Sequence, residues 1–271
     1  LSYEIFFRNE LSTWIDRQEK KEEVLSSQLA QLIIIQDELR ADLLAHENNI
    51  GEKKFAYLPV APRLGKNTIK SQYLRKKYNI PVNKFIVLHS GSFADWTYSD
   101  ELLENVVKWP DNTVLVIHTR YRPNLKDKHI NFIRKQNLNN IILSTDPLSS
   151  IEYERMVCSA DIGLVLYKAL PPSNYLQKHI EIIGLSSGKF SYYSKYGLPI
   201  ISINQKTYAA LLQEYKYGYD LNTFEDIPAS LLHIMSDYDK FSIESNRLFN
   251  EKLAFDLYWP KISYRLSKLL R

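Results

Sequence analysis

The segment IGLSSGKFSYYSKYGLPII (residues 183–201) holds a small-residue run, a lysine, a tyrosine-rich stretch and a Gly-Leu-Pro turn before a β-branched run. Small residues at 186–188 precede a helix that we predict over about 189–196. Pro199 and the isoleucines after it belong to a strand predicted over 198–203. A helix that leads directly into an apolar strand is part of a βα repeat, so the segment points to an α/β fold.

The same segment also suggests a phosphate site. A P-loop needs Gly, four residues, then Gly-Lys-Ser/Thr. Here three residues separate Gly184 from Gly188, and Phe190 replaces the magnesium-binding hydroxyl, which excludes a P-loop. The first turn of a helix still offers unpaired N–H groups and a positive dipole end, to which Ser187, Gly188 and Lys189 add small residues and a charge. A serine N-cap followed by a glycine turn explains the same residues, so both interpretations stay open.

Apolar strands alternate with helical segments along most of the chain. Near-continuous apolar strands between helices are typical of a parallel sheet covered on both faces, so we predict an α/β fold with a Rossmann-like parallel sheet. Such sheets bind ligands at the carboxyl ends of their strands. The predicted strands cover residues 85–90, 113–119, 140–145, 162–167, 198–203 and, as a short sixth strand, 217–221.

The beginning of the chain has a different pattern. Both signs of charge at helical spacing predict a solvated helix over residues 9–30, and the apolar run at 31–36 suits a buried strand. Asp37 is a plausible N-cap for the helix that follows. Residues 57–67 are rich in proline and glycine without a helical period, which indicates a linker.

Composition narrows the possible partners. The net charge of +4 is too small to argue for nucleic acid, and the 19 tyrosines are scattered rather than interleaved with a basic stripe. A single cysteine, Cys158, excludes an intrachain disulfide and favours a reducing compartment, so we expect a cytoplasmic protein. The sequence contains no run of 18 apolar residues, so we expect no membrane-spanning helix. The basic amphipathic end at 261–271 either packs back across the domains or lies at the inner membrane face.

A second small-residue loop ends the first strand of the predicted sheet. Gly91 between Ser90 and Ser92 permits close backbone approach to a ligand, although a tight turn explains it too. Two such loops on parallel strands open at the same sheet edge. His89 and His118 end strands at that edge. No spacing suits a metal site or a serine-nucleophile elbow, so we expect neither.

Taken in order, these segments resemble the carboxyl-terminal half of a GT-B glycosyltransferase, close to glycosyltransferase family 4. The most diagnostic stretch is GLSSGKFSYYSKYGLPIIS (184–202), which is similar to the family form S-x-K-x-x-E-Y-x-x-x-G-x-P-V-I. Lys189, Tyr193, Gly197 and Pro199 match that form. Further similar segments are LIIIQDELRADLL (32–44), YLPVAP (57–62), VLHSGSFAD (87–95) and SSIEYERMVCSADIGLVLY (149–167).

The resemblance implies two Rossmann-like domains and metal-independent sugar transfer from a nucleotide-sugar donor, UDP- or GDP-linked, to a saccharide or lipid-linked acceptor. We accordingly assign residues 1–56 to the tail of the amino-terminal domain, 57–84 to a linker, 85–250 to the nucleotide-sugar-binding domain and 251–271 to a helix that packs back. His118 and Lys189 are the catalytic candidates. The implied donor-binding residues are Ser90, Gly91, Ser92, His118, Pro147, Leu148, Ser187, Gly188, Lys189, Tyr192 and Tyr193.

The chain departs from the family pattern at two positions. Family 4 enzymes often carry two glutamates eight residues apart, and counting back from Gly197 places Gly184 and Tyr192 there. Glu181 and the tyrosines are candidates to replace them. Compared with the family, we also expect only the tail of the first domain, residues 1–56, to be represented in the sequence. Two alternatives therefore remain: a non-catalytic nucleotide-binding or scaffold protein, and a nucleotide-sugar epimerase that uses His89 and His118.

Overall fold

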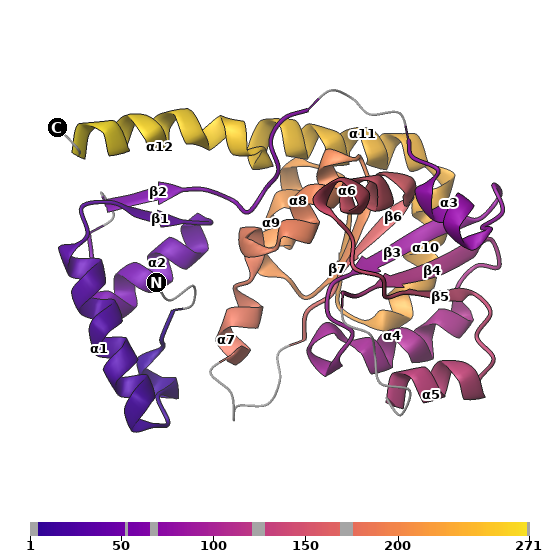
Figure 1. Ribbon diagram of the computed structural model, residues 1–271, viewed down its shortest axis with the longest axis horizontal. Helices are drawn as coiled ribbons and strands as arrows, with labels where there is room; N and C mark the ends of the chain where they lie inside the picture. Colours follow the sequence, from indigo (N-terminus) through magenta and orange to yellow (C-terminus); the bar gives the residue numbers. More distant parts are fainter. Residues whose placement is uncertain (1–4, 52–53, 66–69, 121–127, 169–175, 270–271) are drawn as a thin grey trace.

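The computed structural model describes residues 5–51, 54–65, 70–120, 128–168 and 176–269. Residues 66–69 of the linker assigned to 57–84 and the last two residues of the predicted terminal helix lie outside these ranges. Two units are visible in Figure 1: a large one around a six-stranded sheet and a small one around a two-stranded sheet.

The large sheet has the strand order β5-β4-β3-β6-β7-β8, and every neighbouring pair is parallel. Counted from its first strand, this is the Rossmann order 3-2-1-4-5-6, which reverses direction between β3 and β6. All six strands lie within the predicted ranges, so the predicted parallel sheet is confirmed. They are β3 (Phe85–Ser90), β4 (Thr113–His118), β5 (Ile141–Ser144), β6 (Ile162–Val165), β7 (Ile200–Ile203) and β8 (Gly218–Leu221).

Helices cover both faces of this sheet (Figure 1). Successive strand residues face opposite sides, so Ile86 and Leu88 enter one core and Val87 enters the other. The first face is covered by α3 (Tyr73–Tyr78), α6 (Ser150–Ser159), α8 (Gly188–Lys195), α9 (Lys206–Glu214) and α11 (Tyr238–Leu248). The second is covered by α4 (Ser99–Asn105), α5 (Lys128–Lys135) and α10 (Ile227–Ser236).

The small unit pairs β1 (Ile33–Ile35) with β2 (Phe55–Tyr57) in parallel, beside α1 (Trp14–Leu29) and α2 (Glu38–Asn48). Thr13 and Asp16 form a capping box, which is why α1 begins at Trp14 rather than near residue 9 as the charge pattern predicts. Asp37 caps α2 as predicted, its Oδ1 accepting from Arg40 N at 2.9 Å. Strand β2 was not predicted, and it takes Tyr57 out of the predicted linker.

Two elements connect the units. Helix α7 (Leu176–Glu181) precedes the turn at Gly184–Ser186, and α12 (Phe255–Leu269) follows a π-helical turn at Phe249–Leu253. Helix α12 extends from the large unit over the small sheet (Figure 1), where Arg265 Nη1 donates to Phe55 O at 2.6 Å. No helix in the described ranges is long and apolar enough to span a bilayer. The domain boundaries at 56, 84 and 250 stay predictions.

Candidate functional site

The two small-residue loops meet at the carboxyl edge of the large sheet. Gly91 follows β3, and α8 begins at Gly188. A Cβ built on Gly91 would lie 3.1 Å from Lys189 Nζ, and Gly91 has a φ of +132°. The loop after β3 therefore needs glycine, both for its backbone conformation and for the close approach of the lysine. This meeting point lies beside the reversal in strand order, where open α/β sheets bind ligands.

Lys189 has a buried amine with no acidic partner among the described side chains. Its Nζ lies 4.6 Å from the centre of the Tyr167 ring, a cation–π contact. Within residues 5–269, as far as they are described, Lys189 makes no ion pair. Burial of the amine lowers the pKa of Lys189 to about 7, because a charged group is disfavoured where water is excluded. An anion beside it would restore the charged form.

The start of α8 is not closed by its serine. Ser187 is the N-cap residue, but its side chain makes no capping hydrogen bond and instead lies 2.7 Å from the Tyr167 hydroxyl. The interpretation of Ser187 as a side-chain cap is therefore wrong. The N–H groups of Gly188 and Lys189 occupy the first turn, where an α-helix has no internal partner for them. Both N–H groups belong to the helix that carries the lysine amine.

The buried Tyr193 side chain holds the start of the loop at Gly91 through hydrogen bonds to Ser90. Its hydroxyl accepts from Ser90 N at 3.0 Å and donates to Ser90 Oγ at 3.1 Å. The Tyr153 hydroxyl lies 3.0 Å from the same Oγ. Tyr193 is fully buried, with its ring so close to Gly163 that a Cβ there would lie 2.3 Å from it. The structure places the Tyr193 hydroxyl against Ser90, and its contact with the donor stays a prediction.

Replacing Tyr193 by phenylalanine is expected to lower the free energy of unfolding by about 2 kcal/mol, because the buried Ser90 N–H loses its acceptor. Tyr192→Phe is the matched control on the same helix, since the half-buried Tyr192 hydroxyl bonds to no described group. It should change stability by less than about 0.5 kcal/mol. Urea unfolding of the two variants measures the difference, and equal losses would contradict the support role.

The remaining predicted residues lie around this centre. Tyr192 packs edge-on against Tyr153 at 5.3 Å between ring centres. His118 is buried, with Nδ1 3.1 Å from Ser144 Oγ, and burial lowers its pKa so that it is neutral at pH 7. Pro147 is exposed, and Leu148 packs at the edge of the first core.

Two side chains of the site, Tyr167 and Trp96, were not predicted from the sequence. Tyr167 contacts both Lys189 and Ser187, and Trp96 stacks on its ring at 6.0 Å between centres. Tyr167 ends the predicted strand at 162–167, so its place at the ligand edge could have been recognised. Trp96 has no comparable signal, because a half-buried tryptophan in a turn is ordinary packing.

Gly184 has no room for the glutamate of the family pattern. Its φ is +39°, and an added Cβ would lie 2.6 Å from Asp37 Oδ2 and 2.9 Å from Thr207 Oγ1. The same Asp37 oxygen accepts from Leu185 N at 3.0 Å, which joins the small unit to the turn before α8. The packing of the two units therefore requires glycine at position 184, where the family pattern has glutamate.

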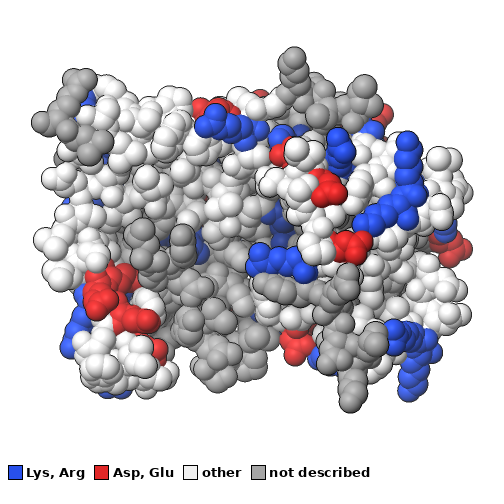
Figure 2. Space-filling view, viewed as in Figure 1, with Lys and Arg blue, Asp and Glu red and all other residues white. Residues whose placement is uncertain are grey.

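Charge elsewhere on the surface is mixed. On the face shown in Figure 2, lysine and arginine side chains are interspersed with acidic ones and do not form one continuous patch. Exposed lysines elsewhere in the described chain form ion pairs, such as Lys108–Glu225 and Lys77–Asp146. A continuous basic stripe of the kind that follows a nucleic acid backbone is not visible on that face.

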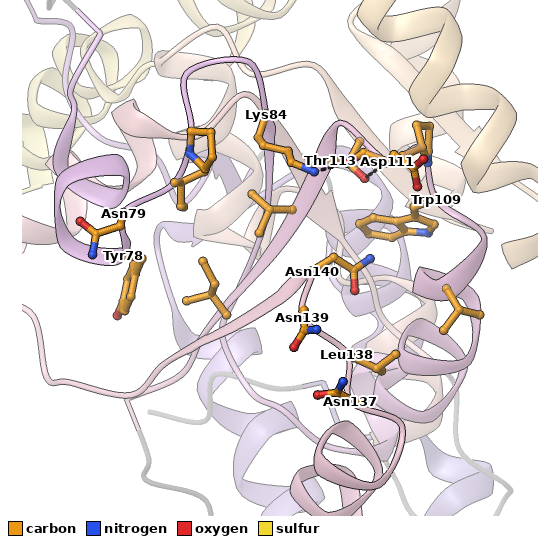
Figure 3. A pocket seen from close by; sticks show the side chains of 16 residues that line it. Tyr78, Asn79, Lys84, Trp109, Asp111, Thr113, Asn137, Leu138, Asn139 and Asn140 are labelled. Atoms are coloured by element: carbon orange, nitrogen blue, oxygen red, sulfur yellow. Dashed lines mark hydrogen bonds between the residues drawn. The ribbon is translucent and has the colours of Figure 1, made fainter.

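A cavity of about 620 Å³ lies at the opposite edge of the sheet, near the first residues of β3, β4 and β5 (Figure 3). The Lys84 ammonium at this cavity donates to the backbone carbonyl of Asp111. Trp109, which lines the cavity, donates from its indole to Asn105 at 2.8 Å. Because parallel sheets bind ligands at carboxyl ends, we place the site at the other edge.

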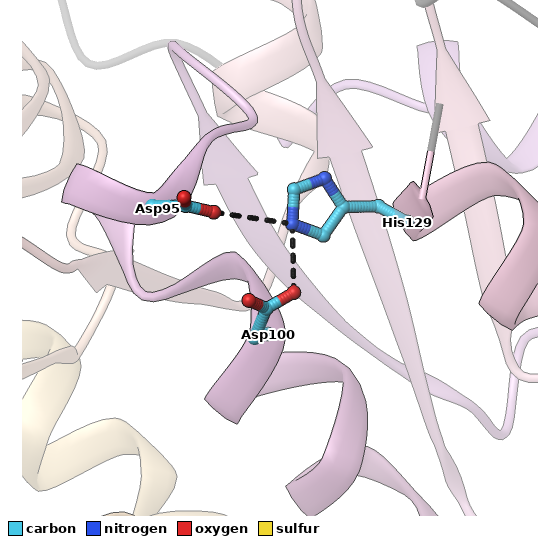
Figure 4. Close-up of side chains that lie close together, drawn as sticks. All are labelled: Asp95, Asp100 and His129. Carbon is cyan, nitrogen blue, oxygen red and sulfur yellow. Dashed lines mark ion pairs between the residues drawn. The ribbon is translucent and has the colours of Figure 1, made fainter. Parts of the chain in front are cut away.

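One described cluster has metal-ligand spacing (Figure 4). His129 Nε2 lies 2.9 Å from Asp100 Oδ1 and 3.8 Å from Asp95 Oδ1. Lys128 Nζ also lies 2.7 Å from an oxygen of each aspartate, and its hydrogen bond lowers the pKa of Asp95. The two carboxylates therefore already share a cation from the protein.

Comparison with known proteins gives structural matches only. No family model matches the sequence, and no curated protein matches it. Anabaena Alr3699/HepE in complex with UDP superposes with a TM-score of 0.70 at 11% identity, covering 97% of this chain and 70% of that one. A glycosyltransferase from Rickettsia africae gives 0.68 at 14% identity, with 93% and 67% covered.

WaaG, a glycosyltransferase involved in lipopolysaccharide biosynthesis, gives a TM-score of 0.64 at 12% identity, covering 93% of this chain and 70% of that one. At such identities the likeness shows the fold alone. The chain has a partial GT-B fold, and the expected GT-B architecture is confirmed.

Proposed function

We propose that this chain binds the diphosphate of a nucleotide sugar at the carboxyl edge of its large sheet and serves in glycosyl transfer. The observation that carries the proposal is the approach of Lys189 Nζ to Gly91, 3.1 Å from where a Cβ would lie. This approach joins an unpaired cation to a glycine loop and to the first turn of α8. Amide N–H groups and one lysine are the groups that protein sites use to bind phosphates.

The chemistry of the proposed reaction is mainly electrostatic. The acceptor hydroxyl forms a bond to the anomeric carbon and gives its proton to the leaving diphosphate or to water, while the bond from that carbon to the diphosphate oxygen breaks. The leaving diphosphate gains negative charge, which the amine of Lys189 and the amides of Gly188 and Lys189 stabilise. Within this proposal the donor is UDP- or GDP-linked, the acceptor is a saccharide or lipid-linked sugar, and no metal takes part. The same proposal includes that the enzyme is a hexosyltransferase similar to those of glycosyltransferase family 4.

Two alternatives differ in what supports them. A non-catalytic nucleotide-binding protein is favoured by Gly184, where no glutamate fits beside Asp37. An epimerase is disfavoured, because it needs groups that exchange protons with the sugar. His89 is fully buried and His118 is 6% exposed, and burial lowers both pKa values, so neither presents a proton donor at pH 7.

Calorimetric titration of the chain with UDP, GDP and pyrophosphate tests the proposal. We expect one of the two nucleotides to bind at micromolar concentration and pyrophosphate more weakly. No heat from any of the three up to millimolar concentration would overturn it. Incubation with the UDP-sugar alone then separates the alternatives: free UDP indicates transfer or hydrolysis, an altered sugar indicates epimerisation, and an unchanged donor indicates binding only.

Binding of UDP should weaken as the pH rises above 7. The pKa of Lys189 is lowered to about 7 in the free protein, so the amine loses its charge between pH 7 and 9. Since the anion binds the charged form, the dissociation constant should rise by up to about tenfold per pH unit. A calorimetric series from pH 7 to 9 measures this slope, and Lys189→Arg, which keeps its charge, should remove it. A flat profile for the native chain would contradict the role of Lys189.

The helix α12 has two different sides. Arg265 bonds to the small unit and Ile262 is 2% exposed, which supports packing across the units. Lys261, Tyr264 and Lys268 are exposed on the other side, and a basic stripe with an aromatic suits an anionic membrane surface. We therefore propose that the protein is cytoplasmic and that the main role of α12 is to join the two units. We propose also that the exposed side of α12 makes a peripheral membrane contact.

A further inference from the structure

The carbonyl of Ser92 is held toward the interior of the protein. His89 is fully buried, and its Nε2 lies 3.2 Å from Ser92 O. A carbonyl oxygen only accepts, so Nε2 carries the ring proton and donates it. Thr97 Oγ1 also donates toward Ser92 O at 3.0 Å, but it divides its single proton with Ala94 O at 2.8 Å. His89 is thus the donor committed to this carbonyl.

The amides of the loop divide into paired and unpaired groups. Gly91 N–H donates to His118 O at 2.9 Å, and Ala94 N–H donates to Thr97 Oγ1 at 3.2 Å. Between them, the N–H groups of Ser92 and Phe93 donate to no acceptor in the described part of the chain. Two successive free amides in a turn form a concave site that favours an anion.

Planarity of the peptide group fixes the direction of one of these amides. In a trans peptide the N–H points opposite to the carbonyl of the preceding residue. Because His89 holds the Ser92 carbonyl inward, the N–H of Phe93 points outward. At the start of the same loop, the amine of Lys189 lies 3.1 Å from where a Cβ on Gly91 would be. The amide and the amine are therefore available to one anion.

We propose that His89 is a positioning residue that directs the Phe93 amide toward the diphosphate of the bound nucleotide, beside Lys189. This inference rests on the proposed function of the site. His89 does not touch the ligand, since it is fully buried. Its burial also lowers its pKa to about 3, so the ring stays neutral and its Nε2–H bond persists across physiological pH.

Titration of the ¹⁵N-labelled chain with pyrophosphate tests the direction of the amide. Pyrophosphate carries the charge of the diphosphate without base or sugar, so it reports this subsite alone. We expect the amide proton of Phe93 to move downfield on binding, more than that of Gly91, whose N–H is already bonded to His118 O. Binding that leaves the Phe93 amide unmoved would overturn the inference while the proposed function stands.

Two variants test the role of His89. In His89→Gln an amide donor replaces Nε2–H, whereas His89→Leu removes the donor at similar volume. We expect His89→Leu to weaken UDP binding about tenfold, the value of one hydrogen bond to a charged group, and His89→Gln to recover most of it. Uridine affinity should stay the same in both, because uridine has no diphosphate.

The UDP-to-uridine ratio separates this role from general destabilisation. Equal losses of UDP and uridine affinity in His89→Leu would mean that His89 only maintains the fold, which overturns the inference. If the leucine variant does not fold, the Phe93 shift in the native chain decides the question. Failure of the native chain to bind UDP, GDP and pyrophosphate would instead remove the proposed function itself.

Discussion

Lys189→Met is expected to weaken UDP binding about 100-fold, since a charge-assisted hydrogen bond to a phosphate contributes about 3 kcal/mol in a water-poor site. Methionine keeps most of the unbranched side chain over Tyr167 and removes the amine, with its charge and its N–H donors. Calorimetry at pH 7 measures the affinity. The matched control is Lys195→Met on the same helix, whose amine lies 3.4 Å from Glu154 Oε2 instead of at Gly91.

The stability of Lys189→Met should change in the opposite direction to its affinity. The buried amine has no acidic partner in the described chain, and its pKa is lowered to about 7, so its charge opposes folding at neutral pH. Methionine removes that penalty, and the midpoint of thermal unfolding should stay the same or rise. Weak binding together with lower stability would indicate a structural defect, and unchanged UDP affinity would exclude Lys189 from the phosphate site.

Gly184→Glu, which restores the glutamate of the family pattern, is expected to destabilise the chain by about 4 kcal/mol. The new Cβ would lie 2.6 Å from Asp37 Oδ2. The backbone at position 184 also has a φ of +39°. A second carboxylate there faces a first one that already accepts from Leu185 N. The loss reflects steric overlap, like-charge repulsion and a backbone conformation that favours glycine.

Two further variants divide the effect of Gly184→Glu into its parts. Gly184→Ala keeps the steric and backbone terms without the charge and should lose about 2 kcal/mol. Tyr192→Glu restores the other glutamate at a half-buried position, where about 1 kcal/mol is the expected loss. Urea unfolding of the full chain measures all three. A Gly184→Glu chain as stable as the native one would show that the two units separate readily at this contact.

The large sheet could be predicted because strands buried on both faces require consecutive apolar residues. Ile86, Val87 and Leu88 illustrate this, since neighbours along one strand enter different cores. Strand β2 could not be predicted, because three residues acquire a strand conformation there only by pairing with β1. The helix over 227–236 was also missed, since its apolar residues follow Pro228 and resemble a loop end.

The candidate site was predictable where it depends on backbone shape and not where it depends on distant contacts. Small residues at the end of a strand identified the loop at Gly91, and small residues before a helix identified the turn at Ser187. The hydroxyl of Ser187 could bond either to the backbone of its own helix or to a side chain distant in the sequence. The sequence alone does not indicate that its partner is Tyr167. The contact between Asp37 and the turn at Gly184 joins segments far apart in the chain, so no local pattern announces it.

The return of α12 affects how the chain can be divided. Phe255 N donates to Pro62 O at 3.2 Å and Leu64 N to Asp256 Oδ2 at 2.6 Å, so the two crossings between the units are bonded to each other. The small unit is therefore completed by a helix from the other end of the chain. A gene fragment that begins at the linker would still encode α12 but would leave Phe55, the acceptor of Arg265, behind. Excision of either unit by a single cut separates a helix from the surface on which it rests.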